Sequence, residues 1–246
     1  EGRAIQVVST VSALPYLWGR KVFVSSAFNV QYFVKVFPKI LQFLPTTAAV
    51  AVVSLLAALV FGMILALIRR FRVKMLYPIS NVYVSFFRST PFIAQIFLLY
   101  YGMAQVFPFI RGMSRFMAVC TILSLSYGAF MGENIRAALS SVDRGQYEAA
   151  LSIGLTFSQS MRRVIVPQAA RVAVPSLMNS FIDLFKATSL CYTIGLRDMM
   201  GGATMEINFS YRYLECYTAV IVIYWSIIVL LTALQGKLEH HLNQAY

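Results

Sequence analysis

Charged residues are scarce in this chain. Asp, Glu, Lys and Arg make up 12% of its 246 residues, and 59% of the residues are hydrophobic. Soluble domains carry about 25% charged residues, so the composition excludes an ordinary soluble domain and predicts a membrane protein. The net charge of +12 comes from dispersed Lys and Arg without a nucleic-acid-binding motif around them. We interpret the excess as loop charge that sets orientation in the bilayer, and we expect no nucleic-acid partner.

Residues for metal binding, disulfides and catalysis are also few. Cys120, Cys191 and Cys216 form no CxxC pair, and His240 and His241 are adjacent near the C-terminus. This spacing predicts neither a disulfide framework nor a metal site. The motifs HExxH and GxSxG are absent, and neither histidine lies in an apolar stretch. The third class of function considered, an intramembrane enzyme, therefore has poor support, and we expect no catalytic residues and no bound cofactor.

The first 27 residues lack the basic, apolar and small-residue regions of a signal peptide. We treat 1–27 as an N-terminal segment of uncertain role and 28–246 as one transmembrane domain. Residues 28–44 are aromatic-rich with Lys35 and Lys39, which predicts a segment along the membrane interface. No internal repeat is visible. Secondary transporters usually contain one, which disfavours the alternative of a stand-alone secondary amino-acid transporter or channel.

Five apolar stretches, joined by short polar linkers, predict an all-α transmembrane fold with a five-helix core. Each is long enough to cross a bilayer, the third only if it continues past Glu133 towards Arg136. We interpret the second as a single long helix broken near Arg88–Pro91, because proline disrupts the helical hydrogen bonds. The five stretches are 45–68, 75–110, 116–132, 172–190 and 216–236.

The fourth stretch carries a polar stripe. Its members recur every three, four or eight residues and so share one helix face. Charged groups at membrane depth cost about 2.5–3.5 kcal/mol, so they normally face a pocket or a partner. Two interpretations stay open: a polar seam between helices or subunits, and a substrate path in which Asp183 and Lys186 also neutralise each other. The stripe consists of Gln168, Ser176, Asn179, Asp183 and Lys186.

Three further features stand out in the apolar stretches. Gln95 is a lone amide in the second stretch, suited either to an interhelical hydrogen bond or to the substrate path. Glu133 and Arg136 suit a local i,i+3 ion pair or a gate at the inner mouth. Gly128 and Gly132 form a GxxxG face that permits close approach of another helix.

Between the third and fourth stretches, residues 143–167 predict a helix–turn–helix. Asp143 with Gln146 predicts a capping box at the first helix, and Thr156 with Gln159 predicts one at the second. Gly154 stands where a left-handed residue would end the first helix. Leu155 and its apolar neighbours supply more hydrophobic surface than a solvated loop needs.

The order Glu148-Ala149-Ala150, three residues, Gly154, nine residues and Val-Ile-Val-Pro resembles the EAA signature of ABC importer membrane subunits. Val164 and Val166 stand where that signature usually has Ile and Leu. The stretches FRSTPFIAQ, YGAFMGENIRAAL and LMNSFIDLFKATSL resemble the polar-amino-acid uptake permeases of bacterial type I ABC importers. The resemblance covers residues 28–240 and implies a coupling helix that docks on a cytosolic ATPase through Glu148, Ala149, Ala150, Gly154 and Leu155.

The resemblance also implies the partners. They are two copies of an ABC ATPase, a second permease subunit, identical or homologous, and an extracytoplasmic amino-acid-binding protein. This chain has no G-x-x-x-x-G-K-[ST] loop, so ATP and Mg²⁺ are expected on the ATPase. A cytosolic coupling loop and five spans place the N-terminus outside the bacterial inner membrane and the C-terminus in the cytoplasm. Cystine, glutamine, glutamate, histidine and arginine all remain open as the transported amino acid.

Overall fold

The computed structural model describes residues 28–244, with side chains through residue 242. The segment 1–27, predicted to stand apart from the membrane domain, lies outside the described residues. The described part of the chain is helical and contains no strand. In chain order its helical elements are α2 (Val30–Leu41), α3 (Leu44–Arg70), α4 (Leu76–Ser89), α5 (Phe92–Phe97), η1 (Leu98–Met103), α6 (Ala104–Val106), α7 (Pro108–Arg111), α8 (Arg115–Ser141), α9 (Arg144–Ser152), α10 (Phe157–Ser160), η2 (Met161–Ile165), α11 (Val166–Ala187), η3 (Thr188–Ile194), α12 (Met199–Ser210) and α13 (Tyr213–Gln244).

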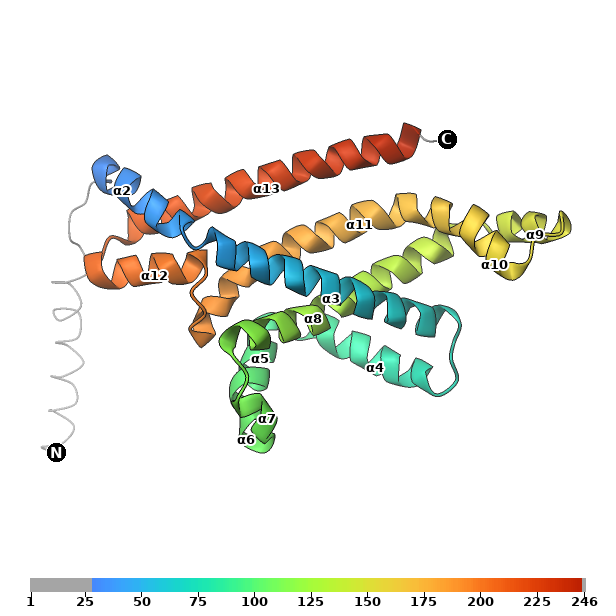
Figure 1. Cartoon of the computed structure of the whole chain (residues 1–246), viewed down its shortest axis with the longest axis horizontal. Helices are drawn as coiled ribbons and strands as arrows, with labels where there is room; N and C mark the ends of the chain where they lie inside the picture. Colours follow the sequence, from blue (N-terminus) through green and yellow to red (C-terminus); the bar gives the residue numbers. More distant parts are fainter. Residues whose placement is uncertain (1–27, 245–246) are drawn as a thin grey trace, which may run out of the picture.

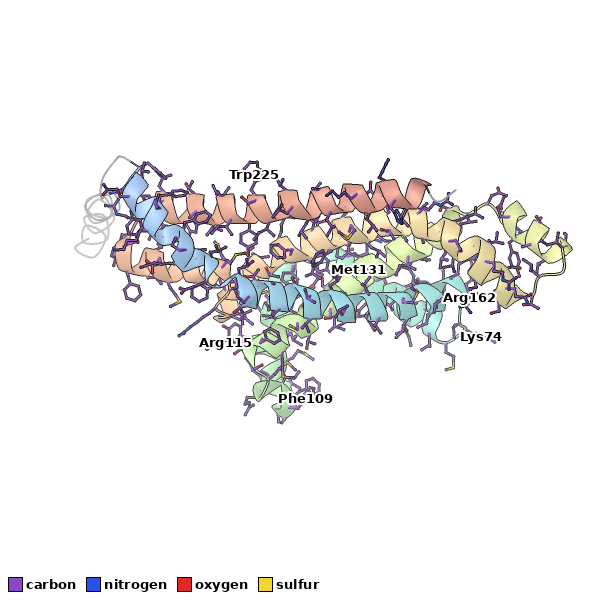
Figure 2. All side chains as sticks on the ribbon, turned by 45° about the horizontal axis from the view of Figure 1, so that its top comes forward. Lys74, Phe109, Arg115, Met131, Arg162 and Trp225 are labelled. Carbon is purple, nitrogen blue, oxygen red and sulfur yellow. The ribbon has the colours of Figure 1, made fainter. Side chains whose placement is uncertain are left out.

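Four long helices, α3, α8, α11 and α13, run lengthwise through one bundle, and α4 lies beside α3 and α8 (Figure 1). The helices α2 and α12 lie at one end of the bundle, and α9 and α10 lie at the other. The last helix, α13, runs from the α2 end towards the α9 end. The buried core includes Met131 of α8 (Figure 2) and Leu123, both without exposed surface. The predicted all-α, five-helix architecture with a protruding hairpin is confirmed.

Not all five helices of the core are equally apolar. Within the described residues, α3, α8 and α13 are long and apolar enough to cross a membrane, and α4 with the following helices adds a fourth if the bent pair is one span. The remaining helix, α11, falls short because of its polar stripe. It begins at Val166, six residues before the predicted start at Val172. Pro167 fits there because the first turn of a helix does not need its N–H.

The predicted break in the second stretch is confirmed, and it divides the stretch into separate helices. The helix ends at Ser89, and the chain resumes as α5 after Pro91, bent by 111°. Thr90 and Pro91 both have extended backbone, which proline and the residue before it favour. As a result, α5 to α7 project from the side of the bundle and carry Phe109 at their tip (Figure 2).

The prediction of a short polar linker between the last two spans is wrong, because α12 lies there. Its N-cap, Asp198, is fully buried and accepts a hydrogen bond from the Gly201 N–H at 2.9 Å. The hydroxyl of Thr47 on α3 accepts another from the Met199 N–H at 3.1 Å. These partners let a helix start inside the protein without unpaired donors. Sequence reasoning missed this element because its two ends lie close to longer apolar runs.

The helices α3 and α8 touch through their backbones. A Cβ atom placed on Gly62 would lie 2.9 Å from the Gly132 nitrogen and 3.0 Å from the Gly128 oxygen. A Cβ on Gly132 would lie 2.9 Å from the Gly62 oxygen. The predicted GxxxG contact is therefore confirmed, and its partner is a third glycine on α3. Helices without a side chain at the crossing gain close packing that a bilayer itself does not supply.

An ion cluster joins the same helices near the hairpin end. Glu133 accepts hydrogen bonds from Arg136 at 2.5 and 3.1 Å and from Arg69 of α3. Arg69 Nε also donates to the Asn81 side chain of α4 at 2.9 Å. The predicted Glu133–Arg136 pair is confirmed, and it extends to α3 and α4. Arg69 thus links α3 both to the Glu133 carboxylate of α8 and to Asn81 of α4.

We expect that Gly62→Ala destabilises the folded chain by about 1–3 kcal/mol, because the new methyl group meets backbone atoms that cannot rotate away. The matched control is Gly236→Ala on α13, where a Cβ meets nothing within 4 Å. That change should stabilise by up to about 1 kcal/mol through helix propensity alone. Thermal unfolding of both variants in detergent measures the difference. Equal melting temperatures would contradict the close-contact interpretation.

Candidate functional site

The first helix of the hairpin, α9, is capped at its start by Asp143. The carboxylate accepts a hydrogen bond from the Gly145 N–H at 2.7 Å, as expected for an N-cap. The predicted return bond from Gln146 is absent, so the capping-box prediction is wrong at this helix. The Gln146 side chain instead accepts a bond from Gln168 of α11 at 3.4 Å. The hairpin is thereby tied to the helix that follows it.

Gly154 ends α9 in the left-handed conformation that its position predicted, with φ of +85°. The Leu155 N–H donates to the Ala150 carbonyl at 3.1 Å, and the Gly154 N–H donates to the Leu151 carbonyl at 2.9 Å. This is the Schellman pattern, which satisfies the last carbonyls of a helix. The next helix begins with the predicted capping box between Thr156 and Gln159, at 2.9 and 3.3 Å. Local sequence therefore determines the turn.

The side chains of the hairpin differ sharply in exposure between its inner and outer faces. Ala150 is 4% exposed and faces the protein, whereas Ile153 is 78% exposed. Glu148 lies on the outer surface and pairs with Arg144 at 2.9 Å. Ala149 and Gly154 are exposed as well, and Leu155 is half-buried. The predicted coupling residues thus share one short hairpin, whose outer surface is rich in apolar groups and lacks a partner within the described chain.

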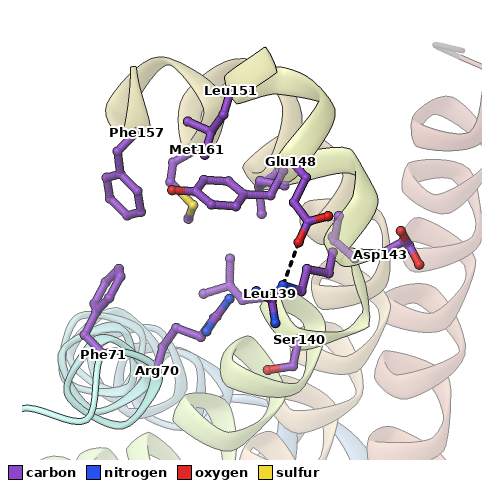
Figure 3. A pocket seen from close by; sticks show the side chains of 13 residues that line it. Arg70, Phe71, Leu139, Ser140, Asp143, Glu148, Leu151, Phe157 and Met161 are labelled. Atoms are coloured by element: carbon purple, nitrogen blue, oxygen red, sulfur yellow. Dashed lines mark hydrogen bonds and ion pairs between the residues drawn. The ribbon is translucent and has the colours of Figure 1, made fainter. Parts of the chain in front are cut away.

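A cleft of about 710 Å³ lies between the hairpin and the ends of α3 and α8 (Figure 3). Phe157 of the hairpin faces Phe71 after α3, with ring centroids 6.0 Å apart, and Tyr147 lies 6.1 Å from Phe157. The contacts of Phe71 and Tyr147 with Phe157 are not predicted from the sequence. The only sequence signal for these two contacts is that both residues are aromatic: Phe71 follows the first apolar stretch, and Tyr147 lies in the hairpin. Beside the cleft, Tyr147 and Met161 also pack against a buried apolar cluster that includes Ile135 and Leu139 of α8.

The polar stripe of α11 is divided between neighbours and open surface. The Asn179 side chain accepts a hydrogen bond from Gln235 of α13 at 3.2 Å. The backbone carbonyl of Ser176 accepts one from Asn134 of α8, also at 3.2 Å. Asp183 and Lys186 form the predicted ion pair at 2.6 Å, with 59% and 53% of their side chains exposed.

The stripe is therefore part bonded to neighbouring helices and part exposed. One part of it joins α11 to α8 and α13, as in the seam interpretation. The charged part is open, on a surface that the single chain leaves uncovered. Charges in a membrane-spanning helix require water, a solute or a polar partner nearby. The open part is consequently the candidate substrate path within this chain.

Gln95 does not join this face. It is 4% exposed, and its amide NH₂ donates to the Phe87 carbonyl at 3.1 Å and to the Thr90 carbonyl and hydroxyl at 3.1 and 2.8 Å. These acceptors belong to the end of α4, where Pro91 removes the N–H that would otherwise bind a carbonyl. Gln95 thus binds the broken helix end.

Comparison with known proteins identifies this arrangement. Residues 58–244 match the family described as binding-protein-dependent transport system inner membrane component. The chain belongs to this family. Its members are non-catalytic membrane subunits of ABC transporters, so ATP hydrolysis is the task of a separate subunit.

Relatives along nearly the whole length agree with the family match. The chain is 48% identical over 219 residues to a probable amino-acid ABC transporter permease protein, PatM, of Vibrio harveyi, covering 89% of this chain and 98% of PatM. It is 40% identical over 216 residues to a probable amino-acid permease protein, YxeN, of Bacillus subtilis, covering 88% and 96%. These relatives make the chain an ABC importer permease and a multi-pass inner membrane protein.

A solved structure has the same fold. The crystal structure of an amino acid ABC transporter with histidines superposes with a TM-score of 0.81 at 29% identity, covering 87% of this chain and 99% of the solved one. This permease therefore matches nearly the full length of that chain.

For this permease we expect that Gln95→Leu lowers stability by about 1–3 kcal/mol, because buried carbonyl groups at the helix break lose their donor. Gln105→Leu is the matched control, since Gln105 is exposed in the same projecting region. Thermal unfolding in detergent, measured alongside transport, separates the two roles. Normal stability but altered solute preference of Gln95→Leu would instead indicate that Gln95 belongs to the substrate path.

Proposed function

We propose that this permease subunit forms the path for a polar amino acid, which an extracytoplasmic binding protein delivers and ATP hydrolysis on the opposite side drives inward. The observation that carries the proposal is the pairing, in one chain, of a rigidly capped apolar hairpin with an open, charged face on the next helix. The names of PatM and YxeN, both amino-acid permeases, support the solute class. A zwitterionic solute suits a face with one carboxylate and one ammonium group.

The coupling role falls to the hairpin through Glu148, Ala149, Ala150, Gly154 and Leu155. Its exposed apolar surface needs a protein partner, and its Schellman turn and capping box keep the two short helices in one shape. A partner that pushes on this shape moves α8 and α11 together, because the hairpin joins them directly. The proposed partner is an ABC ATPase, present in two copies, which binds the ATP and Mg²⁺.

The orientation follows from the same assignment. With the hairpin in the cytoplasm, α13 runs towards the cytoplasm, and α2 and α12 lie at the outer end, where the binding protein docks. Arg69, Arg70, Arg72 and Lys74 then lie at the cytoplasmic ends of the spans, in accord with the positive-inside rule. A second permease subunit, identical or homologous, covers the open α11 face and completes the path.

We expect that Gly154→Val abolishes ATP-driven uptake, while the variant still inserts and folds. A β-branched residue in the left-handed conformation costs about 1–2 kcal/mol, which disfavours the turn without filling any space, since a Cβ there meets nothing within 4 Å. Uptake of labelled amino acid into proteoliposomes, with ATPase and binding protein present, measures the effect. Gly154→Asn is the control, because asparagine tolerates this conformation. A valine variant that binds the ATPase and transports normally would refute the coupling assignment.

A second prediction concerns the α11 face. The double change Asn179→Ala and Asp183→Ala should alter the KM of uptake or the preference among amino acids, because it removes the open Asp183 carboxylate and the Asn179 amide, which is exposed beside it although it also accepts the Gln235 bond. Ser226→Ala is the control, since this exposed hydroxyl on α13 bonds only its own helix at 2.7 Å. Competition between amino acids in the proteoliposome assay is the measurement. Unaltered kinetics and solute preference in the double variant would dismiss the path assignment.

A further inference from the structure

Four of the six residues that line a second cavity at the hairpin end are arginines. The cavity has a volume of about 370 Å³ and lies where the end of α3 and the start of α4 meet the last turns of α8. Lys74 and Arg162 mark this end of the molecule in Figure 2. The residues that line the cavity are Arg69, Arg70, Arg72, Tyr77, Arg136 and Ser140. Two of these residues, Arg70 and Ser140, also line the hairpin cleft (Figure 3).

The charges around this cavity are not balanced within the described chain. Arg69 and Arg136 share one carboxylate, Glu133. Arg70 and Arg72 form no ion pair with any carboxylate among the described residues. Four guanidinium groups thus surround a small space with a single compensating anion nearby. Like charges held this close repel each other unless a further anion binds between them.

The backbone of Arg72 adds a second, independent observation. Its φ is +48°, in the left-handed region, and the Val73 N–H donates to the Ile68 carbonyl at 3.1 Å. Arg72 therefore occupies the position after a helix end where glycine is favoured. The left-handed conformation costs a residue with a side chain about 1–2 kcal/mol. The guanidinium lies 5.9 Å from the Tyr77 ring centre, which holds it at the cavity. Residues kept in such conformations concentrate at functional sites.

We propose that this cavity binds a phosphate group. Guanidinium groups bind phosphate oxygens in pairs of parallel hydrogen bonds, so four of them suit a phosphate better than a single carboxylate. The phosphate can come from an anionic phospholipid headgroup or from a free phosphate. The inference goes beyond the proposed function, because it needs neither the solute nor the ATPase.

The surroundings favour the lipid as the source. Val73, Met75 and Leu76 are exposed and apolar, and they lie close to Arg72 and Lys74 along the same turn. Apolar side chains that enter the acyl region beside cations that reach headgroups are typical of a membrane interface. Basic pockets between helices at this level bind the headgroups of anionic lipids.

The test uses the full-length chain, purified in mild detergent and stripped of lipid. Native mass spectrometry counts the adducts with short-chain phosphatidylglycerol, with phosphatidylcholine of the same chain length, and with inorganic phosphate. The variant Arg70→Gln/Arg72→Gln removes the two cations that have no ion pair. Its matched control is Arg162→Gln/Arg163→Gln, which removes two exposed cations at the same end but outside this cavity. Arg72→Gly removes the guanidinium and also the strain of the left-handed conformation. A loss of binding in this variant therefore cannot be attributed to a loss of folding stability.

We expect wild-type protein to bind phosphatidylglycerol in preference to phosphatidylcholine. Arg70→Gln/Arg72→Gln should weaken that binding about thirtyfold, Arg72→Gly should weaken it with unreduced thermal stability, and the control should leave it unchanged. Inorganic phosphate that binds as tightly, and with the same variant dependence, would support the phosphate site and assign it to free phosphate.

Three results would overturn the proposal. The first is wild-type binding by Arg70→Gln/Arg72→Gln. The second is an equal loss in the control, which would indicate nonspecific surface charge. The third is no phosphate or lipid binding together with weaker ATPase capture by the cavity variant, which would assign the arginines to an acidic protein surface. None of these depends on transport, so a failed coupling test leaves the phosphate result interpretable.

Discussion

The contact between α3 and α8 at Gly62, Gly128 and Gly132 is the constraint on which the rest of the fold depends. Because three glycines remove side chains from the crossing, the two backbones approach to distances that no other residue would allow. Lipid tails are as apolar as leucine, so helices in a bilayer gain little from burial and much from such close packing. The remaining helices are arranged around this pair.

The helices α3 and α8 also hold the hairpin in place through contacts at their ends. The same two helices end in the Arg69–Glu133–Arg136 cluster and then in the aromatic contacts of Phe71 with Phe157. A rigid crossing, an ion cluster and an aromatic contact thus follow one another towards the hairpin. The hairpin itself is joined to α11 by the Gln168–Gln146 bond. The hairpin is therefore in direct contact with the helix that bears Asp183 and Lys186.

Polar groups in this apolar chain serve two purposes. Some bind backbone atoms that irregular geometry leaves free, as Gln95 does at the break before α5 and as Thr47 does at the start of α12. Each of these removes the cost of an unpaired buried group. Others remain open, notably Asp183 and Lys186 on α11 and Arg70 and Arg72 at the end of α3. We propose that these open groups mark the surfaces that bind a solute, a lipid or a partner protein.

The amino-acid sequence by itself determined the features that depend on neighbours along the chain. The apolar runs located the long helices, Gly154 and Thr156 defined the turn of the hairpin, and Pro91 broke the second stretch. Spacing alone also placed Asp183 and Lys186 on one face. These follow from backbone geometry and local hydrogen bonds, which a few consecutive residues decide.

Only the tertiary structure decided which partner each group meets. Nothing in the sequence marks Gly62 as a contact residue; its role is visible only when α8 lies against it. The sequence leaves two roles open for Gln95, and its bonds to the Phe87 and Thr90 carbonyl groups decide between them. The buried start of α12, where Thr47 of α3 binds the Met199 N–H, and the cavity lined by four arginines likewise arise between segments far apart in the chain. Such features depend on distances across helices, and periodicity along one helix carries no information about them.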